Sequence, residues 1–142
     1  MNDKLKKLYQ SVILKHSKEP YQYQENEEAE YQIEAYNPLC GDRFKIYADI
    51  KEGKLIHVSF HGYGCAISKA ATSVLVKQFD QKSIEEALSL CATYKKITTP
   101  QSEEPTINNQ ELEAFEAARN FPGRLKCATL SWEKMEKFLT EL

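Results

Sequence analysis

The sequence predicts an α+β domain in which helices cover a small antiparallel sheet of three strands. Three short stretches between residues 31 and 60 alternate apolar with polar residues, a pattern typical of strands that bury one face. Apolar residues at helical spacing come before these stretches and again after them. We therefore expect helices at both ends of the chain to pack against one central sheet.

The first helix is expected from residue 3 to about residue 17. Apolar side chains share one face of it at helical spacing: Leu5, Leu8, Tyr9, Val12 and Ile13. Pro20 helps to end the helix. Residues 21–30 carry four glutamates, and a charge run of this kind predicts a solvated connector.

The three strand-like stretches are each expected to bury one face. The inward residues would be Tyr31, Ile33 and Ala35 in the first, Phe44, Ile46, Ala48 and Ile50 in the second, and Ile56, Val58 and Phe60 in the third. Glu52 and Gly53 join the last two stretches, and a glycine can supply the positive φ that a tight hairpin turn needs. These two strands should pair antiparallel, with Cys40 at one end of the sheet.

Two helices are predicted after the third strand. Gly62 and Gly64 lead to Cys65, which immediately precedes a helical stretch from Ala66 to about Phe79. Ser83 and Glu86 then have the spacing of a capping box, in which each side chain satisfies the backbone amide of the other. This box predicts a second helix that reaches roughly residue 94.

Residues 95–109 contain two prolines and are predicted to form an exposed excursion before a helix around residues 111–120. A C-terminal helix then follows, with Cys127 in its first turn. Its apolar stripe consists of Ala128, Trp132, Met135, Leu139 and Leu142.

Length and composition limit the class of protein. At 142 residues, with 42% hydrophobic and 28% charged residues, residues 1–142 are expected to form a single domain. A net charge of -2 argues against a nucleic-acid surface. No apolar run approaches the ~20 residues of a membrane span, and the first residues form no export signal, so we expect a cytoplasmic protein with reduced thiols and no membrane partner.

Three of the four cysteines lie in turn-forming contexts. Cys40 precedes Gly41 and Asp42, Cys65 follows two glycines, and Cys127 follows Pro122 and Gly123. An isolated cysteine is often a small buried hydrophobe, but Gly or Pro beside all three favours one composite site. Proximity to a helix N-terminus is expected to favour the thiolate form of Cys65 and Cys127.

A zinc ion suits this set, because thiolates are soft ligands and Asp42 could supply a fourth donor. The predicted metal ligands are Cys40, Asp42, Cys65 and Cys127. Four negative charges around a divalent ion call for nearby cations, which Arg43, Arg124 and Lys126 could supply.

The remaining candidate ligands are weaker. Cys91 lies in an apolar helical pattern and is expected to pack in the core. His16 and His57 are interpreted as packing or surface residues, and His61 is kept as a reserve ligand.

The residues around the cysteines resemble the SufU branch of the IscU/NifU N-terminal family, whose members take part in iron–sulfur cluster biogenesis. The resemblance covers nearly the whole chain and rests on three blocks in order: Asn37 to Asp42, Phe60 to Ser68, and Phe121 to Trp132, preceded by Leu8-Tyr9, Val12-Ile13 and His16. The excursion at residues 95–109 resembles the insertion of the SufU branch. Lys126 stands where IscU scaffolds carry a histidine.

The resemblance implies a SufE/NifU-like fold and zinc bound by Cys40, Asp42, Cys65 and Cys127. It also implies that Cys40 accepts sulfur from a cysteine desulfurase of the SufS type, with Arg124 stabilising charge and with downstream iron–sulfur assembly proteins as further partners. Such a chain would act as a sulfurtransferase. One alternative is a scaffold that assembles a transient iron–sulfur cluster on the same ligands, and another is a purely structural zinc domain.

Overall fold

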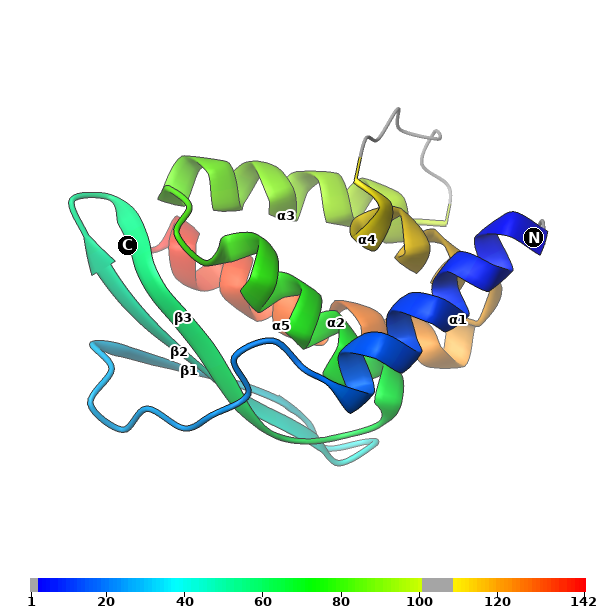
Figure 1. Cartoon of the computed structure of the whole chain (residues 1–142), viewed down its shortest axis with the longest axis horizontal. Helices are drawn as coiled ribbons and strands as arrows, with labels where there is room; N and C mark the ends of the chain where they lie inside the picture. The colour runs from blue at the N-terminus through cyan, green and yellow to red at the C-terminus, as the bar shows by residue number, and fades with distance from the viewer. Residues whose placement is uncertain (1–2, 101–108) are drawn as a thin grey trace.

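The computed structural model describes residues 3–100 and 109–142. Its helices lie on one side of a sheet, as Figure 1 shows. The elements in chain order are α1 (Asp3–Lys18), β1 (Tyr31–Asn37), β2 (Asp42–Lys51), β3 (Lys54–Tyr63), α2 (Ala66–Phe79), α3 (Ile84–Thr98), α4 (Gln110–Glu113), the 3-10 helix η1 (Ala114–Asn120) and α5 (Pro122–Thr140). The predicted α+β class is confirmed.

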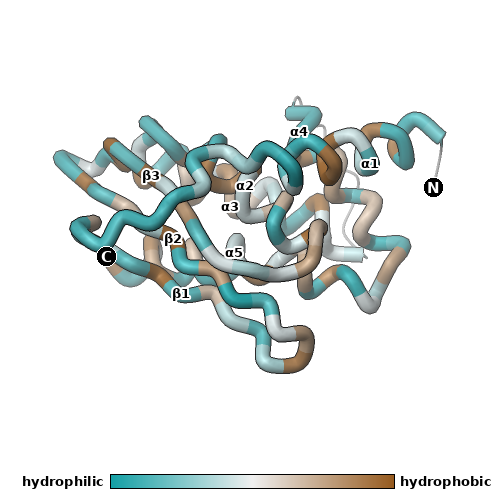
Figure 2. Tube along the Cα trace, turned by 60° about the horizontal axis from the view of Figure 1, so that its bottom comes forward, coloured by the Kyte–Doolittle hydropathy of each residue, from teal (hydrophilic) through white to brown (hydrophobic). Residues whose placement is uncertain are grey.

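The sheet is antiparallel with strand order β1-β2-β3. Asn37 pairs with Asp42 at one end of the β1–β2 ladder, and Arg43 pairs with Tyr63 at the same end of the β2–β3 ladder. The predicted hairpin is confirmed, because Glu52 and Gly53 both have positive φ, at 53° and 76°. The loop between β1 and β2 therefore lies beside the exit of β3 toward α2, and Figure 2 shows this loop projecting past the end of the sheet.

The inward residues of β3 differ from the prediction. The pairing register shifts between Asp49, which pairs with His57, and Ile50, which pairs with Leu55. This bulge leaves Ile56 as an extra residue, and a one-residue insertion reverses the alternation of the strand. The prediction that Ile56 faces the core is wrong: Ile56 is 40% exposed and Leu55 is fully buried in its place.

Helix α2 lies in the centre of the helical layer and contacts β3, α1, α3 and α5. Most of its residues are buried, including Ala70 and Ala71, whose small side chains allow neighbouring elements to approach. The indole of Trp132 on α5 donates a hydrogen bond to the Ala71 carbonyl at 3.1 Å. The Trp132 ring stacks on Tyr94 of α3 with 4.0 Å between centroids. These contacts join α2, α3 and α5 into one core.

Helix α1 packs on α2 and η1 through the predicted face. His16 is 2% exposed and hydrogen-bonds Ser73 Oγ at 2.7 Å and Glu111 Oε2 at 2.5 Å. The interpretation of His16 as a packing residue is confirmed. Its imidazole ties α1 to α2 and to the start of α4. The glutamates of the connector at residues 21–30 are exposed, as expected.

The capping box that begins α3 is confirmed, with Glu86 N to Ser83 Oγ at 3.0 Å and Ser83 N to Glu86 Oε1 at 3.1 Å. The helix runs to Thr98, further than predicted, because Ile97 and Thr98 are buried and extend its packed face. Of the predicted excursion, residues 101–108 lie outside the described residues. None of the described helices is long and apolar enough to cross a membrane.

Candidate metal centre

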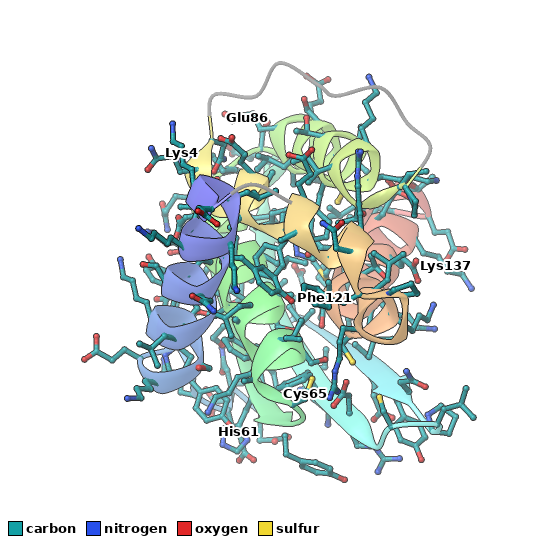
Figure 3. The ribbon with its side chains drawn as sticks, turned by 90° about the vertical axis from the view of Figure 1, so that its right-hand side faces the viewer. Lys4, His61, Cys65, Glu86, Phe121 and Lys137 are labelled. Atoms are coloured by element: carbon teal, nitrogen blue, oxygen red, sulfur yellow. The ribbon has the colours of Figure 1, made fainter. Side chains whose placement is uncertain are left out.

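Four segments meet at one end of the sheet and supply the predicted ligands. Cys40 comes from the β1–β2 loop, Asp42 begins β2, Cys65 precedes α2, and Cys127 lies on α5. Figure 3 shows Cys65 where α2 starts beside the strands, on the same side of the molecule as Phe121, the residue before α5. Cys40 and Asp42 lie two residues apart in the chain. The antiparallel pairing of β2 with β3 brings Cys65 beside Asp42, and the packing of α5 on α2 brings Cys127.

Cys40 is the exposed member of the group. Its loop is held by hydrogen bonds to Asn37, from Gly41 N to the backbone oxygen at 2.8 Å and from Leu39 N to Oδ1 at 3.1 Å. Gly41 has φ of 77°, which the tight return into β2 requires. The Cys40 thiol donates to Asp42 Oδ2 at 3.1 Å. The expectation that Cys40 is the most accessible of the three thiols is confirmed.

Asp42 is 2% exposed, and both of its carboxylate oxygens accept hydrogen bonds. Oδ1 accepts from Cys65 N at 3.0 Å, and Oδ2 accepts from Ser68 Oγ at 2.8 Å as well as from the Cys40 thiol. Burial raises the pKa of this carboxyl, but the hydrogen bonds from Cys40, Cys65 and Ser68 outweigh it and hold the pKa below its usual value. The carboxylate is therefore charged at neutral pH.

Cys65 is the N-cap residue of α2, and its sulfur accepts a hydrogen bond from Ser68 N at 3.4 Å. The predicted position at a helix N-terminus is confirmed. A sulfur at this position receives an otherwise unpaired amide hydrogen of the first turn. The same turn supplies the Cys65 amide that holds Asp42.

The predicted position of Cys127 is wrong. Helix α5 begins at Pro122, which suits the first helical position because its missing N–H needs no partner there. Cys127 consequently lies in the second turn, away from the helix N-terminus. Burial, together with the nearby thiol of Cys65 and carboxylate of Asp42, raises the pKa of its thiol to about 12. The helix N-terminus that was expected to favour the Cys127 thiolate is therefore not beside it.

The donor atoms of Cys40, Asp42 and Cys127 all lie within 4.8 Å of one another in the described part of the chain. The Cys65 sulfur stands outside that set but interacts with the Cys127 thiol. Two thiols and a carboxylate in mutual reach, with a third thiol beside them, suit zinc, since its usual ligands are sulfur, nitrogen and carboxylate oxygen in a four-coordinate shell. The donor set of this structure therefore fits the predicted ion.

Gly64, which the sequence analysis noted beside Cys65, belongs to the same site because it contacts Asp42. A Cβ on Gly64 would lie 2.6 Å from Asp42 Oδ1 and 2.8 Å from Cε2 of Phe44. Such distances are shorter than real contacts, so only glycine lets the β3–α2 loop approach the carboxylate this closely.

Two further residues near the ligands were missed. Ser68 donates to Asp42 through its hydroxyl and to Cys65 through its amide; its position three residues after a helix N-cap was the available signal. The Tyr9 hydroxyl is buried without a hydrogen-bond partner among the described residues. Burial and the charges of Cys65 and Cys127 raise the Tyr9 pKa to about 12, so this hydroxyl lies near the thiols.

The three cations that were expected near the metal ligands differ in where their side chains lie. Arg43 alternates with the buried Asp42 along β2 and therefore points to the other face of the sheet, where it stacks 4.1 Å from the Tyr36 ring centroid and pairs with Glu34 at 3.8 Å. The expectation that Arg43 faces the ligands is wrong. Lys126 pairs with Glu133 at 2.8 Å. Arg124 is exposed, and its charge acts on the Tyr9 hydroxyl beside the thiols.

The weaker candidates lie away from the donor set. Cys91 is 3% exposed in the core, as predicted, and burial raises its pKa to about 12. His61, the reserve ligand, lies 3.4 Å from Glu25 and packs on Tyr23. Neither residue belongs to the group of described donor atoms around Asp42.

Comparisons with known proteins cover nearly the whole chain. The model of the NifU-like N-terminal domain family matches residues 8–128. The zinc-dependent sulfurtransferase SufU of Bacillus subtilis is 32% identical over 136 residues, which are 96% of this chain and 92% of that protein. The iron–sulfur cluster assembly scaffold protein IscU of Streptococcus pyogenes is 32% identical over 134 residues, covering 94% of this chain and 84% of that protein.

Solved structures agree with the fold. The crystal structure of a protein described as an iron–sulfur cluster assembly scaffold for the SUF system of Fervidobacterium islandicum superposes with a TM-score of 0.83 at 29% identity, covering 94% of this chain and 97% of that one. The N-terminal part of a NifU-like protein from Brucella abortus superposes with a TM-score of 0.81 at 16% identity, which shows the fold alone.

Proposed function

Because this chain belongs to the NifU-like N-terminal domain family, as a SufU/IscU-like member, we propose that it relays sulfur in iron–sulfur cluster assembly. Its sulfur would come from the persulfide of a cysteine desulfurase of the SufS type, and it would pass to downstream assembly proteins. The single observation that carries this proposal is an exposed thiol, Cys40, set against a buried carboxylate and a second thiol within 4.8 Å.

The zinc site proposed for this chain consists of Cys40, Asp42, Cys65 and Cys127. Bound zinc supplies one piece of chemistry here, which is to keep its cysteine ligands deprotonated at neutral pH. Cys65 and Cys127 approach from α2 and α5, so the site links the sheet to both helices. Asp42 is already charged and hydrogen-bonded, so it needs no proton loss to serve as a ligand.

The proposed transfer step uses Cys40 as the sulfur acceptor. The Cys40 thiolate attacks the terminal sulfur of the partner's persulfide, a new S–S bond forms at Cys40, and the partner's cysteine leaves as a thiolate. Cys40 ends as a persulfide, the proton on the transferred sulfur stays with it, and no electrons are gained or lost overall. Arg124 would stabilise the negative charge on the reacting sulfurs, since it is exposed on the same side as the thiols.

A protein partner can reach Cys40 without rearrangement of the core. Leu39, the residue before Cys40, is 95% exposed, and Tyr63, two residues before Cys65, is 63% exposed. Exposed apolar side chains beside a reactive thiol offer contact area to a protein that carries a bound substrate. All four cysteines are free, so we propose the reducing cytoplasm as the compartment.

The test of the proposal follows labelled sulfur from the desulfurase. Cysteine labelled with ³⁵S is supplied to a SufS-type desulfurase together with this protein, and the label bound to this chain is measured after separation. Cys40→Ala is expected to abolish labelling, whereas the matched control Cys91→Ala, which alters a buried core cysteine, is expected to label as the wild type does. A Cys40→Ala protein that accepted the label at the native rate would refute the role of Cys40.

The second candidate function is a scaffold for a transient iron–sulfur cluster, which the similarity to IscU proteins favours. Cysteine thiolates bind such clusters, and three of them meet here. Anaerobic reconstitution separates the two functions. A cluster that absorbs visible light and transfers to an apo-ferredoxin supports the scaffold, whereas retained zinc together with persulfide at Cys40 supports the relay.

A further inference from the structure

Ser68 is not a proposed ligand, but it contacts three of the four residues that are: Asp42, Cys65 and Cys127. It lies in the first turn of α2 and is 2% exposed. Its hydroxyl donates to Asp42 Oδ2 at 2.8 Å, and its amide donates to Cys65 Sγ at 3.4 Å. The same hydroxyl lies 3.3 Å from the backbone oxygen of Cys127. The side chain of Ser68 thus connects β2 with α5, and its backbone amide adds the β3–α2 loop.

The Ser68 hydroxyl fixes which way the carboxylate of Asp42 turns. Oδ1 is held by the Cys65 amide at 3.0 Å, and a Cβ on Gly64 would lie 2.6 Å from this oxygen, so the loop closes one side of the carboxylate. Oδ2, held by Ser68, is the oxygen that faces the Cys40 thiol at 3.1 Å. A carboxylate with each oxygen anchored by a different group has little freedom to rotate.

A hydroxyl has one proton, so Ser68 donates to one acceptor at a time. The shorter distance, 2.8 Å against 3.3 Å, and the charge of the carboxylate both favour Asp42 over the Cys127 carbonyl. If the carboxylate moves away, the carbonyl remains in reach as a second acceptor. The buried hydroxyl therefore donates to Asp42 when the carboxylate is in place and to the Cys127 carbonyl when it is displaced. Neither arrangement leaves the hydroxyl proton without an acceptor.

We propose that Ser68 is a positioning residue of the metal site, whose hydroxyl presents Asp42 Oδ2 to the space shared with Cys40 and Cys127. This inference rests on the proposed zinc site and adds a residue to it. The contact that caps α2 uses the backbone amide of Ser68 and is therefore kept when the side chain is changed. The effect on metal binding can thus be separated from the effect on the helix.

The test measures zinc affinity by competition with a chromogenic chelator, and the melting temperature of the metal-free protein alongside. Removal of a group that orients a metal ligand typically weakens affinity by about 10- to 100-fold, and this range is expected for Ser68→Ala. Ser59→Ala is the matched control, since Ser59 is also fully buried but its hydroxyl has no partner among the described residues. That control should keep wild-type affinity.

An isosteric pair makes the test independent of how well the alanine variant folds. Thr and Val have nearly the same shape, so Ser68→Thr and Ser68→Val differ in the hydroxyl alone. We expect the threonine variant to bind zinc at least about tenfold more tightly than the valine variant. Zinc affinity is compared at a temperature where both metal-free variants are folded, because the valine variant loses the buried hydrogen bond to Asp42 and should melt lower. Equal zinc affinity of the two variants would overturn it, as would wild-type affinity in Ser68→Ala.

A different variant tests the proposed zinc site itself. Cys127→Ser removes a proposed ligand and should weaken zinc binding strongly; if wild type and Cys127→Ser bind zinc alike, the site itself is wrong. If Cys127→Ser weakens binding while the threonine and valine variants at position 68 do not differ, the site stands and the role of Ser68 is wrong.

Discussion

Gly64→Ala is the substitution whose effect on the site can be worked out most directly. The new Cβ would lie 2.6 Å from Asp42 Oδ1, whereas ordinary contacts begin at 3.4 Å, so the carboxylate must retreat by the difference of about 0.8 Å. Phe44 Cε2, at 2.8 Å, blocks the Cβ from moving the other way. A retreat of that size is enough to break the 3.0 Å hydrogen bond from the Cys65 amide.

Two measurable losses follow from this displacement. Overpacking of a buried position costs about 1–3 kcal/mol, which for a domain of this size lowers the melting temperature by roughly 3–10 °C. Zinc affinity should fall by about 10- to 100-fold, because the carboxylate no longer stands where the thiols converge. Calorimetry and chelator competition measure the two effects.

The control for this experiment is Gly123→Ala on α5. A Cβ at Gly123 meets nothing within 4 Å, so the change adds the same methyl group without a clash. Alanine in a helix is favoured over glycine by about 0.5–1 kcal/mol, so this variant should melt no lower than the wild type and bind zinc equally well. Wild-type stability and zinc affinity in Gly64→Ala would refute the close approach of the loop to Asp42.

Three further predictions concern stability and thiol access. The hydrogen bond from His16 lowers the pKa of Glu111 from 4.5 to about 2, so the stability that Glu111 contributes is present above pH 4.5 and is lost as the pH falls toward 2. Glu111→Gln should therefore cost about 1–3 kcal/mol in urea unfolding at pH 7 and almost nothing near pH 2; a cost independent of pH contradicts the assignment. Tyr94→Phe removes a buried hydrogen bond of 2.5 Å to a carbonyl of α5 and should lower stability by about 1 kcal/mol, whereas an unchanged melting temperature means that the bond contributes nothing. Chelation of the metal should speed alkylation of Cys40 by iodoacetamide and leave Cys91 slow, as mass spectrometry of the modified peptides can show; equal rates before and after chelation contradict metal binding at Cys40.

Local patterns were sufficient to predict most of the elements. The capping box at Ser83 and the glycine of the β2–β3 turn each specify a backbone conformation through residues that lie next to one another, so both predictions are confirmed. The orientation of Ile56 could not be predicted in this way. A bulge depends on how two strands pair. The alternation of apolar and polar residues along one strand does not show where that strand has one residue more than its partner.

Residue types in the sequence were enough to suggest the four ligands. They did not predict which residues surround each ligand. The sequence placed Cys127 near a helix start because Pro122 and Gly123 look like a preceding turn, whereas Pro122 is itself the first helical residue. Arg43 was assigned to the site because it is adjacent to Asp42, although neighbours in a strand point to opposite faces. The contact of Ser68 with Asp42 joins residues 26 positions apart and depends on the packing of α2 against the sheet.

We propose that Cys40, Cys65, Cys127 and Asp42 bind one zinc ion together. X-ray absorption at the zinc edge of the loaded protein can identify these ligands, because sulfur and oxygen ligands differ in distance, at about 2.3 Å and about 2.0–2.2 Å. We expect a shell of three sulfurs and one oxygen, reduced to two sulfurs in Cys65→Ser as its sulfur leaves the N-cap of α2. A wild-type shell with fewer than three sulfurs would contradict this ligand set.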